Sequence, residues 1–202
     1  MPLTAERLAG AMTPAEYIAQ MKLNREPFEQ VLARVEIPAE VRDFFAALPE
    51  PLDVAVFTED FCGDAVLAVP VLFRLAEETG KLRVRVFLRD ADPELAAEYL
   101  PAERRGTVPV FVFLAPDGRP LGTLIERAPE LYPILAETRR ALAAAHPELP
   151  DADRELGQMS ETTRRVILDG LRRARVEHAR EWGALTAYAF QRTVASGLAS
   201  QR

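Results

Sequence analysis

Four short runs rich in β-branched and aromatic residues occupy the middle of the chain, and they constrain its fold more than any other feature. Short runs of this composition are typical of strands. Segments with helical spacing follow the first, second and fourth runs. The sequence therefore predicts an α/β domain with the element order β-α-β-α-β-β-α. The predicted strands are Leu52–Thr58, Leu82–Leu88, Val110–Leu114 and Pro120–Ile125, and the predicted helices cover 64–79, 92–100 and 129–145.

The connections between these runs predict the strand directions. A helix follows each of the first two strands, and a crossover of that kind returns the chain to the starting edge of the sheet. We therefore expect the first three strands to be parallel. The sequence Pro116-Asp117-Gly118 predicts a tight turn, which makes the fourth strand antiparallel to the third.

The predicted domain spans residues 51–146, and residues 1–50 form an N-terminal helical extension. Thr13 followed by Pro14 is typical of a helix start, and apolar residues then recur at helical spacing over 13–34. Pro27 falls inside this segment, so we expect the helix to break or kink there.

Residues 147–202 form a C-terminal helical extension with two predicted helices over 152–199. Both helices have an apolar stripe, which must be buried against another surface. We expect them to pack on the core of the chain or on a second copy, which would make a homodimer.

The composition excludes several classes of function. A net charge of −6 argues against nucleic acid as a partner. The chain has no run of about 18 apolar residues and no apolar stretch after a basic start, so we expect neither a membrane span nor a secretory signal. A single cysteine, Cys62, rules out an intrachain disulfide and a cysteine-based zinc site, and His146 and His178 are far apart. We expect no metal, no cofactor and a cytoplasmic location, where a lone thiol stays reduced.

The segment Phe61-Cys62-Gly63-Asp64-Ala65 resembles the reactive loop of the thioredoxin superfamily, Trp-Cys-Gly-Pro-Cys, and like that loop it follows a buried strand. Pro70 matches the proline that kinks the next helix in that family. Thr107-Val108-Pro109 precedes the third strand, where the family has its cis-proline. The loop is also similar to that of bacterial thioredoxin family proteins with a single-cysteine Cys-Gly-Asp-Ala site.

The resemblance implies a thioredoxin-like fold over residues 51–146 and a cis peptide bond before Pro109. It further implies that the backbone of Val108 pairs with an extended substrate beside Cys62. Two departures limit what the resemblance implies. Ala65 stands where the family has its second, resolving cysteine, and Val56 stands where thioredoxins have a buried carboxylate. The two-cysteine catalytic cycle is therefore absent.

The reactivity of Cys62 depends on opposing effects. The N-terminus of a helix stabilises a thiolate and lowers its pKa. Glu59, Asp60 and Asp64 are close in sequence, and negative charge raises that pKa. The sequence leaves open whether the pKa of Cys62 is raised or lowered overall. We expect a less acidic thiol than in a typical thioredoxin.

Cys62 and Asp64 each have two alternative interpretations. Cys62 is either a reactive thiol or a small buried residue. Asp64 is either a helix N-terminal charge or a contact to a bound partner, and we expect the acidic loop to lie in solvent.

We interpret the chain as a thioredoxin-like protein with a monothiol thiol–disulfide redox role, catalysed by Cys62. Its partner would be a protein or a low-molecular-weight thiol or disulfide, although no pocket for a thiol cofactor is evident from the sequence. The predicted substrate-binding residues are Phe61, Gly63, Asp64, Val108 and Pro109.

The alternative function is a redox-inactive binding or adaptor protein that uses the same groove. A carrier of iron–sulfur clusters is a third reading, and it would need a dimer with ligands from outside the chain.

Overall fold

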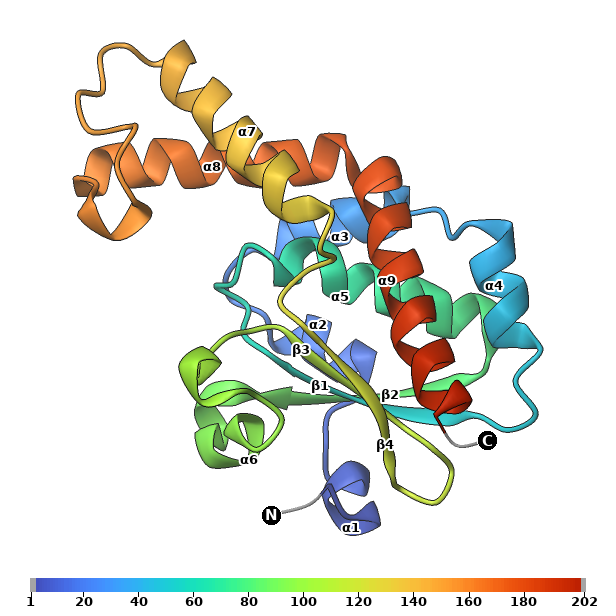
Figure 1. Ribbon diagram of the computed structural model, residues 1–202. Helices are drawn as coiled ribbons and strands as arrows, with labels where there is room; N and C mark the ends of the chain where they lie inside the picture. Colours follow the sequence, from blue (N-terminus) through green and yellow to red (C-terminus); the bar gives the residue numbers. More distant parts are fainter. Residues whose placement is uncertain (1–2, 201–202) are drawn as a thin grey trace.

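A computed structural model describes residues 3–200 and contains one four-stranded sheet with the strand order β2-β1-β3-β4 (Figure 1). The strands have the predicted bounds: β1 is Leu52–Thr58, β2 is Leu82–Leu88, β3 is Val110–Leu114 and β4 is Pro120–Ile125. Helices cover both faces of the sheet (Figure 1). The predicted α/β, thioredoxin-like class is confirmed.

The directions of the strands correct one prediction. β1 and β2 are parallel, and β4 is antiparallel to β3 as expected, but β3 is antiparallel to β1. The connection after β2 contains the short helix α6, Pro93–Ala97. Its five residues rise about 7.5 Å, whereas the seven residues of β2 span about 23 Å, so α6 does not carry the chain back along the sheet. β3 therefore starts where β1 ends, with Val110 opposite Phe57.

The helices of the N-terminal extension differ from the prediction in one respect. The single helix expected over 13–34 is two helices, α2 (Pro14–Gln20) and α3 (Arg25–Arg34). Thr13 and Glu16 form a reciprocal capping box at the start of α2. The break covers residues 21–24 and includes Asn24, which has a left-handed φ of 54°. Pro27 lies in the first turn of α3, where a backbone N–H has no helical partner to lose.

The remaining helices complete the two faces of the sheet. The helix α5 (Ala65–Thr79) runs through Pro70 and is buried on most sides. It contacts β2 of the sheet and packs against α3, α4 (Ala39–Ala46) and α9 (Ala179–Ala199) (Figure 1). Beyond α2, α3 and α6, the helices are α1 (Ala5–Ala9), α4 (Ala39–Ala46), α5 (Ala65–Thr79), α7 (Leu131–Ala145), α8 (Glu161–Glu177) and α9 (Ala179–Ala199).

Alternate residues of the strands face two separate apolar clusters, as the pleat of a strand requires. Val56 and Phe111 face the larger cluster with α5 and α9, while Phe57 and Val112 face a smaller one with α1 and α6. In residues 3–200, no helix combines the length and apolar character needed to cross a membrane.

The C-terminal extension packs on the core of its own chain, because α9 lies directly against β4. Two glycines permit this close approach. A Cβ placed on Gly197 would lie 2.1 Å from the carbonyl oxygen of Leu121, and one on Gly122 would lie 2.8 Å from a methyl group of Thr193. Side chains at either position would push the helix away from the strand.

We predict that Gly197→Ala lowers the free energy of unfolding by about 1–3 kcal/mol, because the added methyl overpacks against the backbone of β4. This loss outweighs the gain of about 1 kcal/mol that alanine brings to a helix interior. Urea unfolding measures the difference. Gly157→Ala is the control, since a Cβ there meets no atom within 4 Å, and we expect a change within about 0.5 kcal/mol. Equal unfolding midpoints for both variants would contradict the packing of α9 on β4.

Candidate functional site

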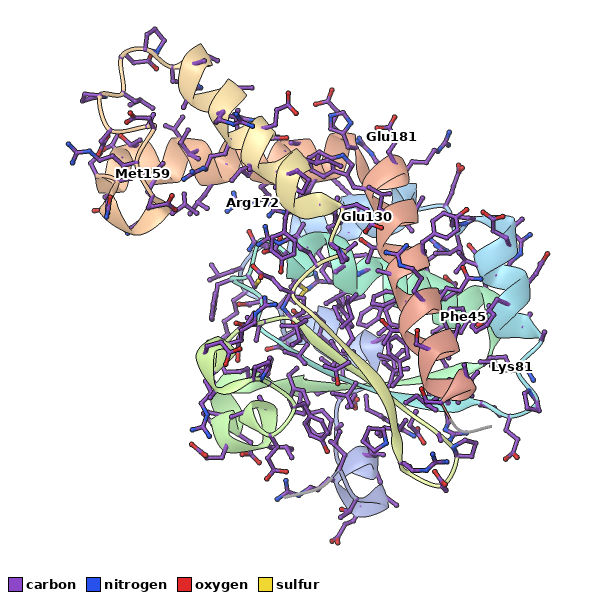
Figure 2. The ribbon with its side chains drawn as sticks, viewed as in Figure 1. Phe45, Lys81, Glu130, Met159, Arg172 and Glu181 are labelled. Atoms are coloured by element: carbon purple, nitrogen blue, oxygen red, sulfur yellow. The ribbon has the colours of Figure 1, made fainter. Side chains whose placement is uncertain are left out.

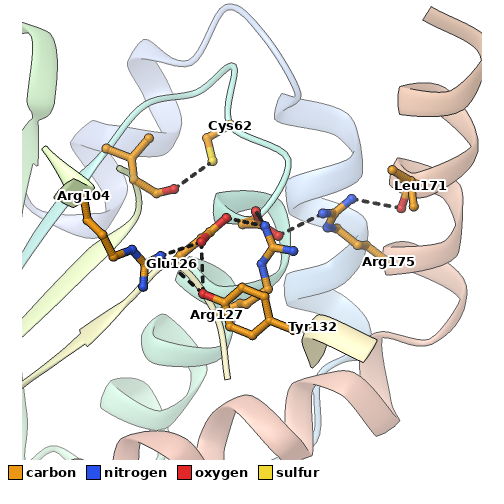
Figure 3. A network of polar contacts seen from close by, with 9 residues as sticks. Cys62, Arg104, Glu126, Arg127, Tyr132, Leu171 and Arg175 are labelled. Atoms are coloured by element: carbon orange, nitrogen blue, oxygen red, sulfur yellow. Dashed lines mark hydrogen bonds and ion pairs between the residues drawn. The ribbon is translucent and has the colours of Figure 1, made fainter. Parts of the chain in front are cut away.

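Cys62 lies in the loop between the end of β1 and the start of α5, at a partly exposed position. Its Sγ is 3.3 Å from the carbonyl oxygen of Val108 and donates a hydrogen bond to it (Figure 3). The peptide bond between Val108 and Pro109 is cis, as predicted. The loop and the residues before β3 therefore form one site, because β1 and β3 are adjacent in the sheet.

Two acidic residues of the loop, Glu59 and Asp60, accept hydrogen bonds from backbone N–H groups of other segments. These contacts correct the expectation that the acidic loop is a solvated surface. Glu59 is buried and accepts a hydrogen bond of 2.7 Å from the backbone N–H of Asp90. The Asp60 carboxylate accepts bonds of 2.7 and 3.0 Å from the N–H groups of Lys22 and Leu23. The N-terminal extension is thereby fastened to the loop from one side.

Asp64 binds two arginines that neither of its predicted roles includes. Its Oδ2 is 2.5 Å from Nη2 of Arg127, and its Oδ1 is 2.9 Å from Nη2 of Arg175 (Figure 3). The side chain makes no capping bond at the start of α5. Arg175 belongs to α8 and is 6% exposed, and it also donates to the carbonyl of Leu171. The C-terminal extension thus reaches the reactive loop through a largely buried ion pair.

A second set of polar groups continues the network toward the start of α7. Glu126 has a φ of 70° and also pairs with Arg127. Its carboxylate accepts a bond of 2.6 Å from Arg104 and one of 3.0 Å from the hydroxyl of Tyr132. The backbone N–H of Glu126 donates to the carbonyl of Pro109 at 2.7 Å, which connects the network to the cis-proline.

Comparison with known proteins agrees with this geometry. A family model described as Thioredoxin matches residues 11–139. The chain belongs to this thioredoxin family. No curated protein matches the sequence.

Two solved structures share the fold of this thioredoxin-family chain. A protein of unknown function from Pseudomonas aeruginosa matches with a TM-score of 0.60 and 16% identity, covering 89% of this chain and 99% of that one. An HIV epitope scaffold matches with a TM-score of 0.58 and 13% identity, covering 94% of this chain and 98% of the other. At these identities the likeness concerns the fold alone.

The surroundings of Cys62 determine in which direction its pKa is shifted, which the sequence leaves open. Burial raises the pKa of the Cys62 thiol above its ordinary value, and the negative charge of Asp64 raises it further. The backbone N–H groups of Ala65 and Asp64 and the guanidinium of Arg175 lower this pKa, but they do not reverse the shift. The thiol is therefore protonated at neutral pH, with groups in place that stabilise its anion.

Behind the loop lies Tyr17 of α2, which is fully buried. Burial raises the pKa of Tyr17 to about 12, and the nearby carboxylates of Asp60 and Glu59 contribute to the shift. The phenol is therefore neutral at physiological pH and adds no charge beside Cys62.

The sequence-predicted site residues come together in part. Phe61, Cys62, Gly63 and Asp64 share the loop, and Val108 meets the sulfur. Arg127 and Arg175 were not predicted, although both touch Asp64. Arginine supplies nearly all of the 25 basic side chains, so no single arginine stands out in the sequence. Within residues 3–200, no group of three His, Cys, Asp or Glu side chains lies close enough to hold a metal ion.

We predict that Asp64→Asn makes Cys62 react with iodoacetamide several times faster at pH 7.5. The substitution removes the carboxylate that raises the pKa of the thiol and leaves the positive charge of Arg175 beside it. The measurement is the alkylation rate against pH, which for the native protein should keep rising above the ordinary titration range of cysteine.

Asp60→Asn is the matched control for this experiment. Asp60 is as close to Cys62 in sequence, but its carboxylate is bonded to backbone N–H groups of Lys22 and Leu23. We expect a smaller acceleration in this variant. Equal acceleration by both substitutions would contradict a specific effect of Asp64.

Proposed function

We propose that the chain exchanges disulfides through one thiol, that of Cys62. The observation that carries the proposal is the position of the sulfur, 3.3 Å from the carbonyl of Val108 and next to a cis-proline. Backbone N–H groups at the start of α5 stabilise the thiolate there. Membership of the thioredoxin family supports this use of the site, because the reactive cysteine of thioredoxins occupies the same place in the fold.

The exchange proceeds in two steps. Cys62 loses its proton to water, and the thiolate attacks one sulfur of a disulfide. A bond forms between Cys62 and that sulfur as the substrate's S–S bond breaks, and the second substrate sulfur leaves as a thiolate that takes up a proton. Because Ala65 has no sulfur, the mixed disulfide persists until an external thiolate attacks it and releases Cys62.

Deprotonation of Cys62 also changes the groove. The neutral thiol donates its hydrogen to the carbonyl of Val108, and the thiolate has no hydrogen to donate. The carbonyl is then free to accept a bond from an extended substrate. We infer that substrate pairing at Val108 and thiolate formation at Cys62 favour each other, while Phe61, which is half exposed, offers an apolar contact.

A redox-inactive binding role for the same groove is the second candidate. The raised pKa of Cys62 favours it, because a protonated thiol reacts slowly. The two candidates share the binding residues and differ in whether a covalent bond to Cys62 forms. For either role, a reducing compartment such as the cytoplasm suits a lone thiol.

We predict that the native protein forms a one-to-one mixed disulfide with 2-hydroxyethyl disulfide, detected by intact-mass spectrometry. The rate should rise about tenfold between pH 7 and pH 8, because the thiolate fraction grows tenfold per unit below the pKa. The adduct should persist after the reagent is removed and disappear on addition of an external thiol.

Cys62→Ala should form no adduct. An adduct that appears in the native sequence only after denaturation would contradict the redox proposal and favour the binding role.

A further inference from the structure

A cavity of about 560 Å³ opens beside the reactive loop, between α7 and α8. Phe61 and Gly63, the two chain neighbours of Cys62, form part of its wall. Pockets of about 300–1,000 Å³ are typical of sites for small ligands. The structure therefore contains, beside the reactive loop, a space that the sequence did not reveal.

The cavity wall is rich in arginine although the chain as a whole is acidic. Arg127, Arg139, Arg172 and Arg175 line it, together with the carboxylates of Asp64, Glu126 and Glu155. Each of these carboxylates forms an ion pair with an arginine of the wall, Glu155 with Arg139 at 3.7 Å, and Glu126 also pairs with Arg104 from outside the wall. The wall holds four arginines and three carboxylates, so the positive charges exceed the negative ones by one.

Two of these arginines are accessible to a ligand. The side chains of Arg139 and Arg172 are 25% and 35% exposed, whereas that of Arg175 is 7% exposed. Arg172 lies on α8 near α7 and pairs with Asp169, one turn before it (Figure 2). Guanidinium groups in this setting pair with carboxylates through parallel hydrogen bonds.

The rim of the cavity collects exposed apolar side chains. Within residues 3–200, the exposed large hydrophobic residues are Leu23, Phe61, Tyr132 and Leu168. Three of them line the cavity, and Leu23 is the chain neighbour of Asn24, which also lines it. Exposed apolar groups gathered at one place mark a binding site rather than an ordinary surface.

We propose that this cavity binds the carboxylate-bearing part of a low-molecular-weight disulfide whose sulfur reacts with Cys62. The inference rests on the proposed function and names its substrate class. Arg139 and Arg172 hold the carboxylate, and Phe61 and Tyr132 contact the apolar part of the molecule. A small molecule fits better than a folded protein because the space lies between two helices. The exchange is the one described above: Cys62 bonds to one half of the disulfide, and the other half leaves as a thiol.

The test compares an anionic and a neutral disulfide. Glutathione disulfide carries carboxylates, whereas 2-hydroxyethyl disulfide is uncharged. The rate of mixed-disulfide formation is measured with each for the native sequence and for Arg139→Gln, Arg172→Gln and the double variant. We expect each single substitution to slow the reaction with glutathione disulfide about five- to tenfold and to leave the reaction with the neutral disulfide unchanged. Arg42→Gln, at an exposed arginine outside the cavity wall, is the charge-matched control.

A binding measurement separates this inference from the proposed function. S-methylglutathione has no free thiol or disulfide, so its binding by calorimetry does not depend on the reactivity of Cys62. We expect it to bind the native sequence and Cys62→Ala alike, and to bind the double arginine variant at least tenfold more weakly.

The outcomes are distinct. Reaction with both disulfides at rates that the arginine variants leave unchanged would overturn the inference and leave the proposed function intact. Binding of S-methylglutathione without reaction of either disulfide would overturn the proposed function and support the cavity as an anion site. If S-methylglutathione binding does not depend on the two arginines, the assignment of the cavity as a carboxylate-binding site is overturned.

Discussion

The carboxylate of Asp64, held between the guanidinium groups of Arg127 and Arg175, is the interaction on which the site depends. It fixes the reactive loop to the C-terminal extension, since Arg175 belongs to α8. On the other side, Asp60 fixes the loop to the N-terminal extension through the N–H groups of Lys22 and Leu23. The extensions are therefore parts of the site, and the loop conformation is set by segments that lie outside the predicted residues 51–146.

The same carboxylate restrains the chemistry of the loop. Its negative charge raises the pKa of Cys62, in addition to the effect of burial, while Arg175 lowers it. An ion pair this buried repays its desolvation only when its geometry is good, and removing one partner leaves an uncompensated charge. Anchoring the loop and activating the thiol thus place opposite demands on Asp64. A ligand that redistributes the arginine charge around Asp64 would change the acidity of Cys62, and the arginine-lined cavity lies where such a ligand would act.

Local patterns predicted the local structure well. The four strands have the expected bounds, the cis bond before Pro109 is present, and Thr13 caps a helix. The direction of β3 was wrong because it depends on how far the short helix α6 travels, and the periodicity of a sequence does not measure that distance. Arg175 was missed because it is 111 residues from Asp64, so only the tertiary packing of α8 brings the two together. The cavity was missed for the same reason, since α7, α8 and the loop form its walls jointly.

The most direct test of this account is a double-mutant cycle between Asp64 and Arg175, measured as free energy of unfolding in urea. Asp64→Asn and Arg175→Gln are made singly and together. Because the two side chains are largely buried and bonded to each other, we predict a coupling free energy of about 1–3 kcal/mol, with the double variant more stable than the sum of the single effects implies. Effects that add within about 0.5 kcal/mol would contradict the claim that this ion pair fastens the reactive loop to the C-terminal helices.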